Sequence, residues 1–213
     1  MKAFLNFCSK ELIVPAILLL STTTWANPSS DSTKIESLSF LADSRIQING
    51  DSTMKKFSAV ASTMSLRGTA KRTADSSGKL PWTPIAVEMV LAVEDLKSGD
   101  ATLDKHMYEN LKMEKHHEIK LNLSNFSFTE NSRGANEVVA SGTLTVAGIS
   151  KPVELNATLT VEGEKLRISG NKTVLMSDFG IEPPTMMLGI LKTRNEISVN
   201  FYVTCLTNNT VKD

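Results

Sequence analysis

Apolar and polar residues alternate with a period of two along most of the chain, a pattern typical of strands that bury one face of a sheet. The alternation is clearest from Val153 to Val161, where the intervening residues are Glu, Asn and Thr. Two other segments repeat it, with apolar positions at Ile85, Val87, Met89, Leu91 and Val93 and at Ile197, Val199, Phe201, Val203 and Cys205. The pattern predicts three strands with one buried face each, and it places Cys205 on such a face.

Five further segments have strand-like patterns and bring the predicted total to eight; they are residues 45–49, 57–69, 118–129, 137–147 and 166–176. Between Leu123 and Phe126 the apolar phase slips by one residue, which predicts a β-bulge. The short gaps between strands contain Gly, Asn, Asp and Ser, which favours antiparallel pairing of successive strands.

One segment has a helical pattern instead. From Asp100 to about Lys115, the apolar residues Leu103, Met107 and Leu111 recur every four positions, and Asp100 can cap the first turn. This predicts one helix between the third and fourth strands. Eight antiparallel strands of this kind can stack as a sandwich or close into a barrel, and the alternation does not distinguish the two.

The N-terminal segment, residues 1–26, is interpreted as a secretory signal peptide. Lys2 and Lys10 precede an apolar run that is too short to span a bilayer, and small residues follow up to Ala26, where we expect cleavage. Export would place the protein in the periplasm or outside the cell, without stable membrane insertion after cleavage. Residues 27–34 are then a polar leader, 35–208 a single β domain and 209–213 a tail.

The charge and the cysteine content of the chain argue against nucleic-acid binding and against an internal disulfide. The 213 residues contain 23 Lys and Arg and 23 Asp and Glu, so the chain lacks the basic excess that nucleic-acid binders use. Removing the predicted signal takes away Lys2, Lys10 and Glu11 and leaves 21 basic and 22 acidic residues, a net charge of −1. Of the two cysteines, it leaves Cys205 alone, so the exported domain would have no internal disulfide.

The sequence contains no pattern of a known catalytic or metal site, such as a nucleophile elbow, a phosphate-binding loop or a zinc-binding Cys pair. His116 and His117 are adjacent at a helix-to-strand junction, and we interpret them as loop residues, because a metal site needs more ligands in a suitable geometry. We therefore expect no catalytic residue, no metal and no cofactor. An enzymatic function is a weaker alternative.

The segment from Gly180 to Leu191 is unusually apolar for a loop, since it includes Ile181, Met186, Met187 and Leu188. Adjacent methionines suit an adaptable hydrophobic contact. The segment either plugs one end of the β domain or contacts an apolar ligand or partner.

Six stretches of the chain together resemble the YceI-like family, which is described as polyisoprenoid-binding with a lipocalin-like barrel. They are residues 48–54 (INGDSTM), 96–105 (LKSGDATLDK), 111–119 (LKMEKHHEI), 142–153 (GTLTVAGISKPV), 176–187 (MSDFGIEPPTMM) and 192–197 (KTRNEI). The resemblance implies an exported, all-β, eight-stranded antiparallel barrel with one helix near one end and an apolar interior for an isoprenoid chain. In the most similar branch a His follows the first turn, whereas this chain has Lys55 and Lys56 there. No role of that His is carried over.

The expected function is to hold a polyisoprenoid, quinone or similar long-chain amphiphile without catalysis. The expected lining consists of Met89, Leu91, Val93, Val153, Leu155, Leu159, Ile197, Val199 and Phe201, with Met186, Met187 and Leu188 at a mouth. Lys192 and Arg194 are candidate contacts for a ligand head group. The alternative is a periplasmic stress or interaction module with a packed barrel and a Met-rich docking loop. The sequence leaves a homodimer open.

Overall fold

The computed structural model describes residues 35–72, 82–130, 136–162, 165–186 and 191–206. The predicted signal peptide, polar leader and C-terminal tail lie outside these residues, as do Met187 and Leu188 of the apolar loop. No helix in the described part of the chain is long and apolar enough to cross a membrane.

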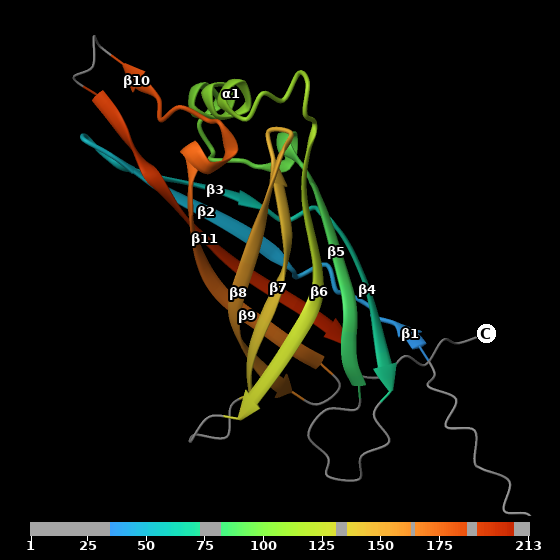
Figure 1. Ribbon diagram of the computed structural model, residues 1–213. Coiled ribbons are helices and arrows are strands. Elements are labelled where there is room, and N and C mark those ends of the chain that lie inside the picture. Colours follow the sequence, from blue (N-terminus) through green and yellow to red (C-terminus); the bar gives the residue numbers. More distant parts are fainter. Residues whose placement is uncertain (1–34, 73–81, 131–135, 163–164, 187–190, 207–213) are drawn as a thin grey trace, which may run out of the picture. The chain divides into compact units, whose positions relative to one another are not determined.

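The described residues form eleven strands, one α-helix and two short 3₁₀ helices (Figure 1). The strands are β1 (Ile35–Ser37), β2 (Arg45–Ser52), β3 (Lys56–Ala61), β4 (Ser65–Arg72), β5 (Trp82–Ala92), β6 (Glu118–Glu130), β7 (Asn136–Val146), β8 (Ile149–Glu162), β9 (Lys165–Leu175), β10 (Thr185–Met186) and β11 (Leu191–Leu206). The helices are η1 (Val93–Asp95), α1 (Ala101–Asn110) and η2 (Met176–Phe179).

All strands belong to one antiparallel, curled sheet with the order β1-β4-β5-β6-β7-β8-β9-β11-β2-β3, and β10 pairs with β11 (Figure 1). The prediction of eight strands in a closed barrel is therefore wrong in count and closure. The predicted strand over residues 57–69 divides into β3 and β4, and the short strands β1 and β10 were not predicted. β1 and β3, at the two ends of the strand order, do not pair with each other in the described residues.

Isolated bridges link the chain near the two ends of the strand order to other segments. β1 pairs with β4, and the residues that follow β1 contact β11. There, Phe40 bridges Cys205, and the Leu206 amide donates to the Ser39 carbonyl at 2.9 Å. On β3, the Val60 amide donates to the Lys97 carbonyl at 2.8 Å. The curled sheet is thus held by local bridges where a closed barrel would have a continuous ladder.

Two bulges set which side chains face inward. The pairing of β6 with β7 shifts register between Leu123 and Asn125, which confirms the predicted bulge. A second shift, in the pairing of β4 with β5, leaves Ile85 without a register partner between Pro84 and Ala86. The Ile85 side chain is 41% exposed, so the expectation that it faces inward is wrong.

The helix α1 confirms the prediction for this segment, although it ends at Asn110 rather than near Lys115. One carboxylate oxygen of Asp100 accepts from the Thr102 amide at 2.9 Å and the Leu103 amide at 3.1 Å, as expected for a helix cap. The Tyr108 hydroxyl donates to the Leu96 carbonyl at 2.8 Å, which ties α1 to the segment that follows β5.

One buried cluster joins the first and last described segments around Cys205, which is fully buried, as predicted. Its other members are Leu38, Ala70, Val138, Leu159 and Leu166. Burial disfavours the thiolate and raises the pKa of Cys205 to about 12, so the thiol stays neutral in the folded protein at physiological pH.

Because the pKa of Cys205 is raised in the folded protein, we expect the protein to lose stability in alkaline solution. The pKa of the thiol is near 9.0 when exposed and about 12 when folded, so the unfolded state ionises first as the pH rises. The contribution of this thiol to the free energy of unfolding is fully present below pH 9. Between the two pKa values it falls by about 1.4 kcal/mol per pH unit. Urea midpoints between pH 8 and about 11 measure the slope. The Cys205→Ala variant should show a shallower slope, and equal slopes would contradict the assignment.

Candidate functional site: an apolar cavity inside the sheet

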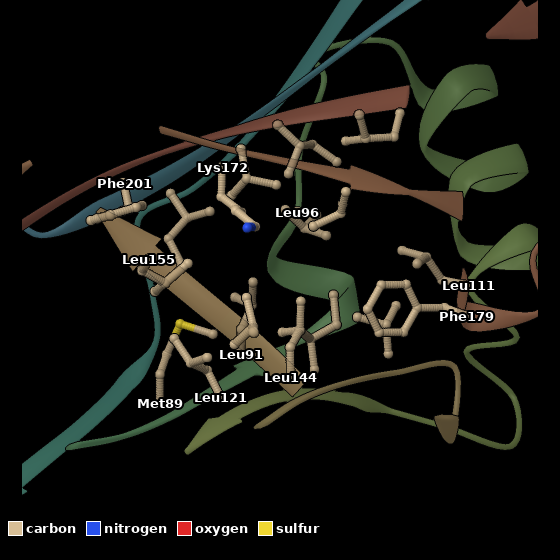
Figure 2. Close-up of a pocket in the computed structure, with 18 of the residues that line it drawn as sticks. Met89, Leu91, Leu96, Leu111, Leu121, Leu144, Leu155, Lys172, Phe179 and Phe201 are labelled. Atoms are coloured by element: carbon tan, nitrogen blue, oxygen red, sulfur yellow. The ribbon is translucent and has the colours of Figure 1, made fainter. Parts of the chain in front are cut away.

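The inward faces of the strands enclose a cavity of about 790 Å³ (Figure 2). This volume is within the range of pockets that hold small organic ligands. Strands β2, β5, β6, β7, β8, β9 and β11 all contribute side chains to the wall. The helix α1 contributes Leu103 and Met107, and Leu111 follows directly after it. The curled sheet is therefore hollow along its concave face.

The alternation of the sequence explains the apolar wall. On β5, Val87, Met89 and Leu91 face the cavity, whereas Glu88 between them is exposed. On β6, Leu121 and Leu123 line the wall in the same way. Because side chains alternate across a strand, each strand supplies its apolar set to the cavity and its polar set to solvent.

The structure brings most of the predicted lining together. Eight of those residues line the cavity: Met89, Leu91, Val153, Leu155, Leu159, Ile197, Val199 and Phe201. Val93 is buried in η1 and is not in the wall, because the chain leaves the sheet after Ala92. The backbone of Met186 pairs with Leu191 in β10, while Met187 and Leu188 lie outside the described residues.

The two predicted head-group residues are not part of the described wall. The Arg194 side chain is 74% exposed, and its Nε lies 3.3 Å from a carboxylate oxygen of Asp51. An exposed ion pair of this kind contributes little to stability. Lys192 is exposed, and its backbone amide donates to the Thr53 hydroxyl at 3.2 Å. A head-group role for either residue remains a prediction.

A different lysine, Lys172 of β9, points into the cavity (Figure 2). Sequence reasoning missed it, although a signal was present: Lys172 is in phase with the apolar residues Ile168 and Val174 of the same strand. Charged residues on an apolar face are uncommon and call for a partner. This lysine therefore places a cationic group in a wall that is otherwise mainly apolar.

The remaining polar wall residues with long or ionisable side chains are Lys55, His106 and Asn110. His106 and Asn110 belong to α1, where the Asn110 side-chain amide donates to the His106 carbonyl at 2.6 Å. No Asp or Glu is present among the wall residues that the structure describes. The wall thus offers hydrogen-bond donors and positive charge but no negative charge.

The geometry gives no support to a metal centre at the adjacent histidines. A side chain at Gly148 would collide with the His116 ring, so His116 packs against the turn between β7 and β8. The His117 carbonyl accepts from the Val93 amide at 2.9 Å. Within the described ranges, no three His, Cys, Asp or Glu side chains gather at a distance suitable for a metal ion.

Solved structures with a similar fold include proteins of Burkholderia cenocepacia, Saccharophagus degradans and Campylobacter jejuni. BcnA of Burkholderia cenocepacia superposes with a TM-score of 0.59 at 14% identity, covering 76% of this chain and 96% of that chain. A polyisoprenoid binding domain of Saccharophagus degradans, implicated in plant cell wall breakdown, gives 0.57 at 9% identity, covering 81% and 99%. A YCEI protein of Campylobacter jejuni gives 0.51 at 18% identity, covering 67% and 81%. At these identities the likeness shows the fold alone.

No curated protein sequence matches the chain at a significant level. The model of the YceI-like domain family, by contrast, matches residues 33–205. That range includes the helix α1 and the strands that border the cavity, except for Leu206, the last residue of β11. The resemblance seen in the six sequence stretches is thereby confirmed, and the chain belongs to the YceI-like family.

Proposed function

We propose that the protein holds one long-chain amphiphile, such as a polyisoprenoid or a quinone with a prenyl tail, in the cavity without changing it chemically. The observation that supports this most is the cavity of about 790 Å³ with its mainly apolar wall. A domain that needed the space only for its own stability would fill it with side chains, since protein interiors are close-packed.

The apolar wall can supply sufficient affinity. Burial of about ten methylene equivalents at roughly 0.8 kcal/mol each gives on the order of 8 kcal/mol before other terms. Ordering of the chain and loss of its free motion take back a substantial part. A ligand therefore needs most of its tail inside the cavity, which favours long single chains over small compact molecules.

Three further parts of the proposal each have a separate support. The choice of a prenyl chain is supported by the Saccharophagus degradans domain, which has this fold and is described as polyisoprenoid-binding. Export to the periplasm is supported by the charge and apolar pattern of residues 1–26. Binding without catalysis is supported by the sequence, which contains no recognised catalytic pattern.

The alternative function, a packed barrel with a docking loop, receives no support from the cavity. A packed interior would leave no space of this size beside Leu91, Leu121 and Leu155. The centre of the Met-rich loop lies outside the described residues.

Native mass spectrometry tests the proposal. The full chain, produced in a bacterium that exports it, is expected to carry one amphiphile per protein, which denaturing spectra then identify. The reason is that an open apolar cavity in contact with a membrane-rich environment fills with a matching chain. A ligand-free mass that stays unchanged after incubation with polyprenyl lipids and quinones would contradict the proposal. Cleavage after Ala26 in the same spectrum would support export.

A further inference from the structure

Lys172 occupies an unusual position in the sheet. It lies on β9 just beyond the part of that strand that pairs with β8, which runs from Lys165 to Gly170, and it keeps its pairing with β11. Its register partner on β11 is Val199, another wall residue. The close-up shows its amino group directed into the space between apolar side chains, among them Leu96 and Leu155 (Figure 2).

The described part of the chain provides no anionic partner for this amino group. No side-chain hydrogen bond or ion pair among the described residues includes the amino group of Lys172. Asn171, its exposed neighbour on β9, bonds to Ser198 and Asn200 on the outer face instead. No Asp or Glu belongs to the described wall. Without an anionic partner, the amino group depends on water for its hydrogen bonds.

A bound hydrocarbon would change the hydration of the Lys172 amino group. An apolar chain that fills the space next to Lys172 displaces the water that hydrates its amino group, and a desolvated, unpaired charge is strongly unfavourable. A ligand that places an anionic oxygen at the same point replaces that hydration with a charge-assisted hydrogen bond. The cavity thus disfavours a plain hydrocarbon and favours a chain with an anionic end.

We propose that Lys172 binds the carboxylate of a long-chain acid whose tail occupies the apolar cavity. This rests on the proposed function, because it requires an amphiphile in the cavity. The carboxylate lies beside Lys172, near the α1 end, where Val174 packs against the cluster of Phe179 and Ile181. The tail runs along β9 past Ile168 toward Cys205.

The number of cationic groups favours a carboxylate over a diphosphate. A diphosphate carries more charge and usually contacts several cationic or amide donors, often a bidentate arginine. The described wall contains no arginine, and its other lysine, Lys55, lies in the turn between β2 and β3 and is exposed. One inward lysine matches one carboxylate.

The test compares hexadecanoate with hexadecan-1-ol, which have the same chain and differ in the charged end. Affinities come from displacement of the neutral dye Nile red from the full-chain protein. We expect the native protein to bind the acid roughly tenfold more tightly than the alcohol. Lys172→Met keeps an unbranched side chain in the wall but removes the charge, so the preference should fall to unity or reverse. Lys172→Arg should preserve it.

Two control variants test whether the preference for the acid depends on Lys172 in particular. Lys55→Met removes the other lysine of the wall, and Lys151→Met removes an exposed lysine of β8; both should retain the preference for the acid. The proposal is overturned if Lys172→Met keeps the preference, or if Lys55→Met loses it. If the native protein binds the alcohol and the acid equally, only the carboxylate assignment fails. If it binds neither, the long-chain acid is ruled out, and the proposed function is decided separately by the mass-spectrometric test with polyprenyl lipids and quinones.

Discussion

Leu155→Trp is expected to fold and to bind long-chain amphiphiles about thirtyfold more weakly. Leu155 points into the cavity from β8 (Figure 2), where the free volume of about 790 Å³ leaves room for a larger side chain. The indole would exclude two to three methylene groups of a ligand, and at roughly 0.8 kcal/mol each this costs about 2 kcal/mol of binding free energy. Dye displacement measures the affinity, and the urea midpoint measures the folding.

The neighbouring position provides the control for this variant. Glu154 is exposed and lies on the opposite face of β8, so Glu154→Trp introduces the same side chain outside the cavity. It should leave the affinity unchanged. An unaltered affinity in a correctly folded Leu155→Trp protein would mean that the ligand does not occupy the space next to β8.

Gly142→Ala is expected to destabilise the protein by about 3 kcal/mol, a large part of the stability of an ordinary domain. Gly142 of β7 pairs with Leu123 of β6, next to the bulge in that strand. A methyl group at this position would collide with the Asn122 carbonyl and would lie 2.8 Å from the Leu123 Cα. Both obstacles are backbone atoms, so a change of side-chain rotamer cannot relieve the collision.

Gly99→Ala separates this collision from the usual cost of replacing glycine. Gly99 has a φ of +83° but no atom within 4 Å of an added methyl group, so its replacement costs only backbone strain, about 1 kcal/mol. Urea unfolding of both variants gives the comparison. If Gly142→Ala loses no more stability than Gly99→Ala, then β6 and β7 do not approach this closely.

The sequence was informative wherever a local pattern determines structure. The alternation around Met89, Val153 and Val199 identified strands and their buried faces, because side-chain direction along a strand follows directly from position. The phase slip after Leu123 identified the bulge for the same reason. Asp100 identified the start of α1, since capping depends on residues within one turn.

Strand pairing over long distances was less predictable. The break between β3 and β4 contains neither Gly nor Pro, so the pattern over residues 57–69 looks like one strand. Closure of the sheet depends on whether strands far apart in the chain meet, and alternation carries no information on this. Eight strands in a closed barrel was therefore a reasonable but wrong expectation.

The cavity, too, could be predicted from the sequence only in part. The inward residues could be identified from alternation, but a wall residue and a packed core residue have the same pattern, so the hollow interior required the structure. Val93 illustrates the reverse error, because it continues the alternation of β5 although the chain has already left the sheet in η1. Lys172 could have been found, because a lysine in phase with Ile168 and Val174 interrupts an apolar face.

The strand order also determines when the protein can fold during synthesis. The last strand of the chain, β11, lies between β9 and β2. Within the described residues, β2 and β3 are connected to the rest of the sheet through β11, and Val60 also bridges Lys97 of the segment before α1. The N-terminal hairpin of β2 and β3 is consequently among the first parts to leave the ribosome and among the last to find its neighbour. Such non-local pairing slows folding. In a cell, this hairpin would expose its apolar side to chaperones until Cys205 and its surroundings emerge.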